Sequence, residues 1–241
     1  MGESGTVVDI DAHFIDHLDE IYEYLDDDDP WKEKFRLGSE EEKSGVTSFF
    51  PKQTFNSYRA QSAMERSAFE TKNDILNDMD KLGIDKILLI GQQLLRTGAI
   101  RADDKRPIKY AEAYMEYILD NIVDPDEGIY CTVPVVSSDP DWARRIIERY
   151  GDEKSVVGAV LVSSGGEPPY GSRRYDTVYE VCEKKGLPVM YHADSASLDD
   201  FHYHGFSTNL ETHSLGFLIA NMSQLTSVVV QGVPEKFPDL E

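Results

Sequence analysis

The sequence is poor in cysteine, in long apolar runs and in basic residues. Its 241 residues include only two cysteines, Cys131 and Cys182, without Cys-x-x-Cys spacing. We therefore expect both thiols to be reduced, buried and structural. No run of about 18 apolar residues occurs, and no basic segment followed by an apolar run opens the chain. These absences exclude a membrane span and a secretory signal, and they predict a cytoplasmic protein.

The scarcity of basic residues narrows the choice of partner. Lysine and arginine number 24 against 45 aspartates and glutamates, which gives a net charge of -21. A surface of this sign repels phosphate backbones and anionic lipids, so we expect neither nucleic acid nor a membrane as partner. It suits a salt-rich, halophilic cytoplasm. We expect a small-molecule substrate, and the sequence leaves a homo-oligomer open.

The pattern of elements predicts one barrel-type domain over residues 1–241. Continuous apolar runs, typical of buried strands, lie at 86–91, 129–133, 156–162 and 188–192. Amphipathic helical stripes separate them, so the strands form a parallel sheet covered by helices. Such a sheet is either doubly wound or a (β/α)8 TIM-type barrel. No glycine-rich dinucleotide fingerprint follows any strand, which favours the barrel.

An acidic and aromatic insertion is predicted at about residues 20–65. It holds the acidic runs 26–29 and 40–42 and an aromatic patch from Phe49 to Tyr58. We interpret this stretch as irregular. The acidic runs lack the ligand spacing and central glycine of a calcium loop, so we expect them to be solvated.

The first strand, within residues 7–14, ends in polar side chains. Because side chains alternate along a strand, Asp9, Asp11 and His13 are expected on one face, with apolar residues on the other. Two carboxylates and an imidazole at a strand end suit a divalent cation. In the alternative interpretation, the aspartates cap a turn and His13 is an ordinary surface residue.

His192 ends the fifth predicted strand as His13 ends the first. Taken alone, it suits a hydrogen-bonded core histidine. In a closed barrel, however, the first and fifth strands face each other across the rim. Side chains from both could then reach one cation.

Three motifs resemble the amidohydrolase superfamily, in particular its amidohydrolase-related branch with the aminocarboxymuconate-semialdehyde decarboxylase-like proteins. Asp9–His13 is similar to the strand-one signature of this branch, and Gly186–His192 is similar to its strand-five element. Gly232–Leu240 looks like the segment that leads into strand six. The resemblance covers nearly the whole chain.

The resemblance implies Asp11, His13 and His192 as metal ligands, with Asp9 orienting the strand behind them. It implies zinc first, with manganese or magnesium competing because Asp11 adds an oxygen ligand. The family's remaining metal-site aspartate and its acid/base residue would lie beyond Glu241. The expected fold is therefore a barrel truncated after about five βα units.

Two reactions agree with the resemblance: hydrolysis by a metal-bound water, or decarboxylation of a small cyclic or aromatic carboxylate. Arg96, His204 and His213 are candidates for the substrate pocket. The rival interpretation is a non-catalytic barrel fragment that binds a small molecule or a protein through the aromatic patch.

Overall fold

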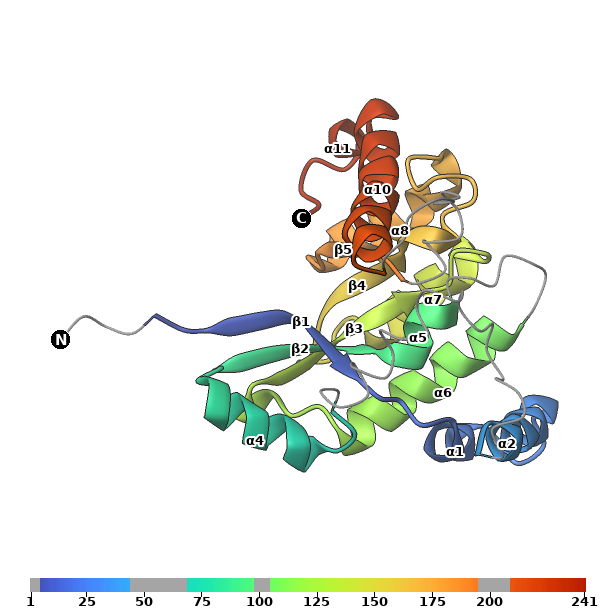
Figure 1. The fold of residues 1–241 in the computed structure, drawn as a ribbon. Helices are drawn as coiled ribbons and strands as arrows, with labels where there is room; N and C mark the ends of the chain where they lie inside the picture. The colour runs from blue at the N-terminus through green and yellow to red at the C-terminus, as the bar shows by residue number, and fades with distance from the viewer. Residues whose placement is uncertain (1–4, 44–68, 98–104, 195–208) are drawn as a thin grey trace.

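A curved sheet of five parallel strands forms the centre of the computed structural model, which describes residues 5–43, 69–97, 105–194 and 209–241 (Figure 1). The strands are β1 (Val8–Phe14), β2 (Lys86–Gly91), β3 (Ile129–Val135), β4 (Val156–Val162) and β5 (Val189–His192). Their order in the sheet is their order in the chain. A doubly wound sheet reverses direction at a switch point, whereas a barrel adds strands in sequence. The fold is therefore a half-barrel, as the sequence predicted.

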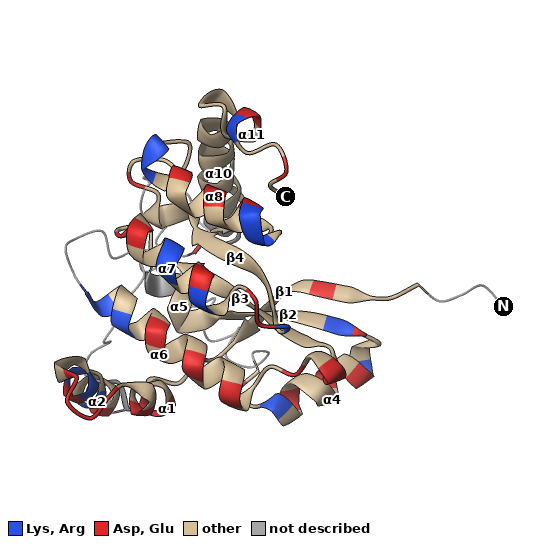
Figure 2. Cartoon of the chain, turned by 180° about the vertical axis from the view of Figure 1, so that it is seen from behind, with Lys and Arg blue, Asp and Glu red and all other residues tan. Residues whose placement is uncertain are grey.

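Helices connect the strands, and α4, α6, α7 and α8 lie over one face of the sheet (Figures 1 and 2). The described α-helices from residue 69 onward are α4 (Lys72–Leu82), α5 (Gln92–Thr97), α6 (Arg106–Asn121), α7 (Pro140–Tyr150), α8 (Asp176–Lys185), α10 (Asn209–Val230) and α11 (Val233–Lys236). Short 3-10 turns occupy Pro125–Glu127, Ser163–Gly165 and Arg173–Tyr175. Among the described residues, no helix is long and apolar enough to cross a membrane.

Local signals start and end these helices. The Asp139 side chain accepts a hydrogen bond from the Trp142 N–H, which caps the start of α7. Gly83 and Gly186 follow α4 and α8 in the left-handed conformation, with φ of 69° and 63°. Each helix therefore stops at its glycine and turns into the next strand.

The prediction that residues 20–65 are irregular is wrong for the part that the structure describes, up to residue 43. Residues 18–43 form α1 (Leu18–Ile21), a 3-10 turn at Tyr22–Tyr24 and α2 (Pro30–Lys43). Asp29 accepts a hydrogen bond from the Trp31 N–H, so Asp29-Pro30 starts α2 as Asp139-Pro140 starts α7. Phe35 is fully buried and its ring lies 6.1 Å from that of Tyr110. The aromatic patch from Phe49 to Tyr58 lies outside the described residues.

β1 is less regular and less buried than predicted. Its register against β2 slips between Asp9 and Ala12, so a bulge interrupts the expected alternation. Val8 and Ile10 are 52% and 60% exposed. Within the described sheet β1 pairs with β2 alone, and only its last residues reach the core. The bulge lies directly before the polar strand end.

The core is rich in tyrosine and contains both cysteines. Cys131 and Cys182 are buried and free, as predicted. Among the tyrosines that the structure describes, five are fully buried: Tyr110, Tyr114, Tyr170, Tyr175 and Tyr179.

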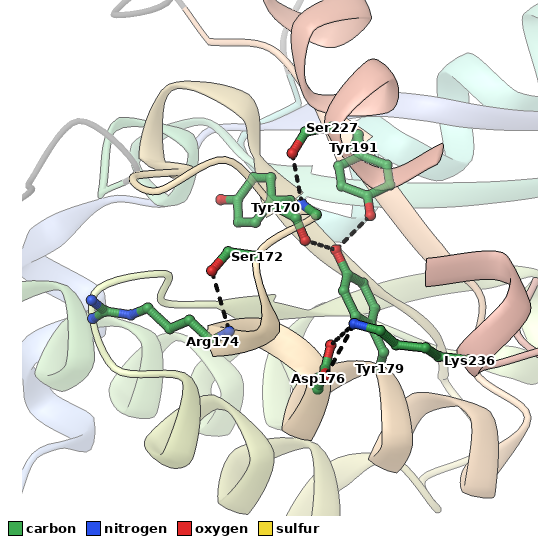
Figure 3. A network of polar contacts seen from close by, with 9 residues as sticks. Tyr170, Ser172, Arg174, Asp176, Tyr179, Tyr191, Ser227 and Lys236 are labelled. Carbon is green, nitrogen blue, oxygen red and sulfur yellow. Dashed lines mark hydrogen bonds and ion pairs between the residues drawn. The ribbon is translucent and has the colours of Figure 1, made fainter. Parts of the chain in front are cut away.

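Buried hydroxyls attach β5, α8 and α10 to one another (Figure 3). The Tyr179 hydroxyl donates to the Tyr170 carbonyl at 2.8 Å and lies 2.8 Å from the Tyr191 hydroxyl. The Gly171 N–H donates to Ser227 on α10. Since Tyr191 precedes His192 on β5, this network holds the strand whose last side chain enters the candidate site.

Candidate metal centre

Three side chains meet at the carboxyl ends of β1 and β5. Asp11 Oδ1 lies 2.9 Å from His192 Nε2 and 3.6 Å from His13 Nε2. One donor atom from each residue lies within 4.8 Å of the others. β1 and β5 share no hydrogen bonds in the sheet, because three strands separate them. The curvature of the sheet therefore builds this cluster, as expected for opposite positions on a barrel rim.

The cluster is open on one side. The His13 and His192 side chains are only 22% and 16% exposed, whereas the Asp11 side chain is 62% exposed. The two rings meet edge to face, with centroids 5.2 Å apart. The two imidazoles are therefore mostly buried, and the Asp11 carboxylate is accessible to solutes.

Asp11 and His13 influence each other's ionisation. The imidazoles of His13 and His192 beside the Asp11 carboxylate hold its pKa well below the usual range, because their protonated forms stabilise its negative charge. For His13, burial is the largest influence and lowers the pKa. The Asp11 carboxylate outweighs this by stabilising the protonated ring, and the pKa of His13 is raised above its ordinary value. The aspartate is therefore ionised at neutral pH, as a metal ligand must be.

The donor set fits a divalent cation. A cation with bonds of about 2.1 Å brings its ligand atoms about 3 to 3.5 Å apart, close to the two distances from Asp11 Oδ1. Two imidazoles and one carboxylate suit zinc, manganese and related ions. The Nδ1 atom of His192 is buried, and none of the described residues provides it with a hydrogen-bond partner. This nitrogen stays unsatisfied, while Nε2 points into the cluster.

Gln92 and Asp16 lie on the side of His13 away from the cluster, and the sequence predicted no specific role for either residue. The Oε1 atom of Gln92 lies 2.9 Å from His13 Nδ1. Asp16 is fully buried and accepts hydrogen bonds from the N–H groups of Gln93 and Leu94 at the start of α5. Polar residues ending β2 were a visible signal for Gln92. No local signal shows that Asp16 is buried.

Burial also controls the ionisation of Asp16. It raises the pKa of this carboxyl to about 6, although hydrogen bonds from Gln93, Tyr110 and Leu94 oppose the shift. The Tyr110 hydroxyl donates to Asp16 Oδ2 at 2.8 Å. Asp16, three residues after His13, therefore holds the start of α5 by hydrogen bonds, although burial disfavours its ionised form.

Of the other predicted site residues, the structure describes the side chain of Asp9 alone. Asp9 Oδ1 accepts the N–H of Asp11 at 3.0 Å, a contact that holds the strand just before the cluster. The side chains of Arg96, His204 and His213 lie outside the described residues. Their place in a substrate pocket stays a prediction.

The family follows from a match over almost the whole chain. The family model described as Amidohydrolase matches residues 8–241. The chain therefore belongs to the amidohydrolase family, as the three motifs indicated. The comparison with curated proteins found no match.

Solved structures share the fold at low sequence identity. An amidohydrolase from Mycobacterium avium subsp. paratuberculosis has a TM-score of 0.71 and 17% identity. The alignment covers 100% of this chain and 72% of the amidohydrolase chain. A dihydroxybenzoic acid decarboxylase from Polaromonas with bound manganese matches 98% of this chain and 64% of its own, with a TM-score of 0.64 and 15% identity. A 5-carboxyvanillate decarboxylase from Novosphingobium aromaticivorans, complexed with manganese, matches 100% and 65%, with a TM-score of 0.64 and 17% identity.

These likenesses establish the fold. The chain spans between 64% and 72% of the length of the three structures. Barrel-type amidohydrolases and aromatic acid decarboxylases both share its architecture.

Proposed function

We propose that this protein binds one divalent cation through Asp11, His13 and His192 and uses it to decarboxylate a small aromatic acid. The observation that carries the proposal is that three donor atoms from the two opposite edge strands of the sheet lie within 4.8 Å of one another. A salt bridge could explain one aspartate beside one histidine. A second imidazole directed at the same carboxylate oxygen suits shared coordination better.

Manganese is the cation we propose first. The Asp11 carboxylate adds a hard oxygen donor to two nitrogens, a set that accepts manganese as well as zinc. Both decarboxylases compared above are described with manganese. The comparisons give no support for zinc, which the sequence led us to expect first.

The residues of this chain would hold the cation at the mouth of the half-barrel. When bound, it would neutralise a substrate carboxylate and stabilise negative charge in the transition state. Asp11, the most exposed ligand, lies on the side from which a planar acid could enter. In the reaction the bond from ring carbon to carboxylate breaks, carbon dioxide leaves, and the ring carbon keeps the electron pair and gains a proton.

A binding experiment tests the cation site. The metal-free protein is titrated with manganese chloride and then zinc chloride by calorimetry, alongside Asp11→Ala and His192→Ala. We expect one cation per chain in the wild type and loss of binding in both variants. His17→Ala is the matched control, since His17 instead lies 3.7 Å from Glu70. A folded wild type that binds neither cation would refute the proposal.

A reaction assay then tests the chemistry. The manganese-loaded protein is incubated with 2,6-dihydroxybenzoate or 5-carboxyvanillate, and carbon dioxide release is measured. Decarboxylases of these two acids share the fold of this chain. Release that depends on Asp11 supports decarboxylation. Turnover of esters or amides alone would replace it with hydrolysis, and cation binding without turnover of either class would favour the non-catalytic interpretation.

A single domain, a cytoplasmic location, a halophilic source and a homo-oligomer stay predictions.

A further inference from the structure

Gln92 is the hydrogen-bond partner of His13 on the side away from the cluster. Its Oε1 atom lies 2.9 Å from His13 Nδ1, while His13 Nε2 faces Asp11. A neutral imidazole carries one proton on either nitrogen. An amide oxygen can only accept, so this contact requires the proton of neutral His13 on Nδ1.

We propose that Gln92 is a positioning residue that keeps Nε2 of His13 unprotonated and directed at the cation. The inference rests on the proposed function, because it assigns a role toward the cation that Asp11, His13 and His192 would hold. Partners behind metal-binding histidines fix the ring and its tautomer, and their loss typically weakens metal binding about 10- to 100-fold.

Hydrogen bonds and close packing fix the backbone position of Gln92. Gln92 begins α5, and the next two N–H groups of that helix donate to the buried Asp16 at 2.6 and 3.0 Å. Gly91 precedes it in a space without room for a side chain. A Cβ atom there would lie 2.7 Å from both Asp16 Oδ2 and a ring carbon of Tyr114. Asp16 therefore fixes the turn that carries Gln92 to His13.

The other histidine of the cluster is held differently. His192 Nδ1 is buried and finds no hydrogen-bond partner in the part of the chain that the structure describes, and Nε2 lies 2.9 Å from Asp11 Oδ1. With no acceptor on Nδ1, the neutral ring keeps its proton on Nε2 and donates it to Asp11. Neutral His13 therefore already presents an unprotonated Nε2 to a cation, whereas neutral His192 must first move its proton from Nε2 to Nδ1. Gln92 creates this difference.

The test reads the tautomer directly and without metal. Histidine labelled with ¹⁵N is introduced into wild type, Gln92→Leu and Gln92→Glu, and long-range ¹H–¹⁵N spectra are recorded at pH 8.5. The His13 signals are assigned from their loss in His13→Ala. We expect protonated Nδ1 in the wild type and in Gln92→Glu, which keeps the acceptor, and a mixture of tautomers in Gln92→Leu. Gln231→Leu, an exposed glutamine at the end of α10, controls for the substitution itself.

Calorimetric titration with manganese chloride supplies the second readout. We expect about 10- to 100-fold weaker binding in Gln92→Leu and near wild-type binding in Gln92→Glu. If the His13 tautomer is the same in Gln92→Leu as in the wild type, the inference is wrong whatever the protein binds. If the tautomer changes but the manganese affinity does not, Gln92 does not position the ligand. A wild type that binds no cation refutes the proposed function, while the tautomer spectra still decide whether Gln92 controls His13.

Discussion

Replacing Asp16 by asparagine should make the protein less sensitive to pH. Asp16 is fully buried, and its pKa is raised to about 6 from an ordinary 3.8 because burial penalises the charge. An acid with a higher pKa in the folded state binds more protons when folded. The stability it contributes therefore falls as pH rises from 3.8 to about 6.

The size of the effect follows from the same two pKa values. A difference of about two pKa units, at about 1.4 kcal/mol each, corresponds to about 3 kcal/mol in the free energy of unfolding. About 2 kcal/mol of this falls between about pH 4.5 and 7.5. Asparagine has nearly the same size and cannot ionise. The stability of Asp16→Asn relative to wild type should therefore rise by about 2 kcal/mol over this interval.

Urea unfolding of both proteins at the two pH values measures this difference. Asp141→Asn, which removes an exposed aspartate, controls for the loss of a charge. Asp16→Ala should instead lose about 3 to 5 kcal/mol at neutral pH, because it leaves the N–H groups of Gln93 and Leu94 and the Tyr110 hydroxyl without their acceptor. If the difference between Asp16→Asn and wild type is the same at both pH values, burial does not control this carboxyl.

Two further predictions concern cation binding and the thiols. The pKa of His13 is raised in the metal-free protein, so manganese affinity should fall about tenfold per pH unit below that pKa, as protons compete for the ligand. Calorimetry at pH 7.5 and 5.5 checks this, and equal affinities would contradict it. Burial raises the pKa of Cys131 and Cys182 to about 12, so neither should react with a disulfide reagent at pH 8 until the chain unfolds. Rapid labelling of the folded protein would show that a thiol is accessible.

Local signals explain why most elements could be predicted. The capping box of Thr71 and Asp74 and the left-handed Gly83 act within one turn of α4, so its limits are visible in the sequence. The apolar runs of β2 to β4 are continuous because helices and core cover the sheet. The start of α2 is also visible in the sequence, since Asp29-Pro30 repeats the Asp-Pro signal that starts α7. The acidic residues around it favoured the interpretation of a solvated, irregular segment instead.

Long-range contacts account for what could not be predicted. The β1 bulge and the exposure of Val8 and Ile10 depend on which strands lie beside β1. The burial of Asp16 depends on α5 and α6 packing over it, and Tyr110 is 94 residues away. The contact of Gln92 with His13 joins residues 79 positions apart. No pattern within one strand or helix carries this information.

The sequence by itself determined the alternation of strands and helices, the parallel sheet, the acidic surface and the residue types at each strand end. Hydrophobic periodicity, helix caps and charge depend on residues that are close in the sequence, so they can be predicted from the sequence alone. Only the tertiary structure decided that Asp11 and His192, 181 positions apart, lie 2.9 Å from each other. Their meeting depends on the curvature that five twisted parallel strands accumulate, and that curvature is a property of the whole packed sheet.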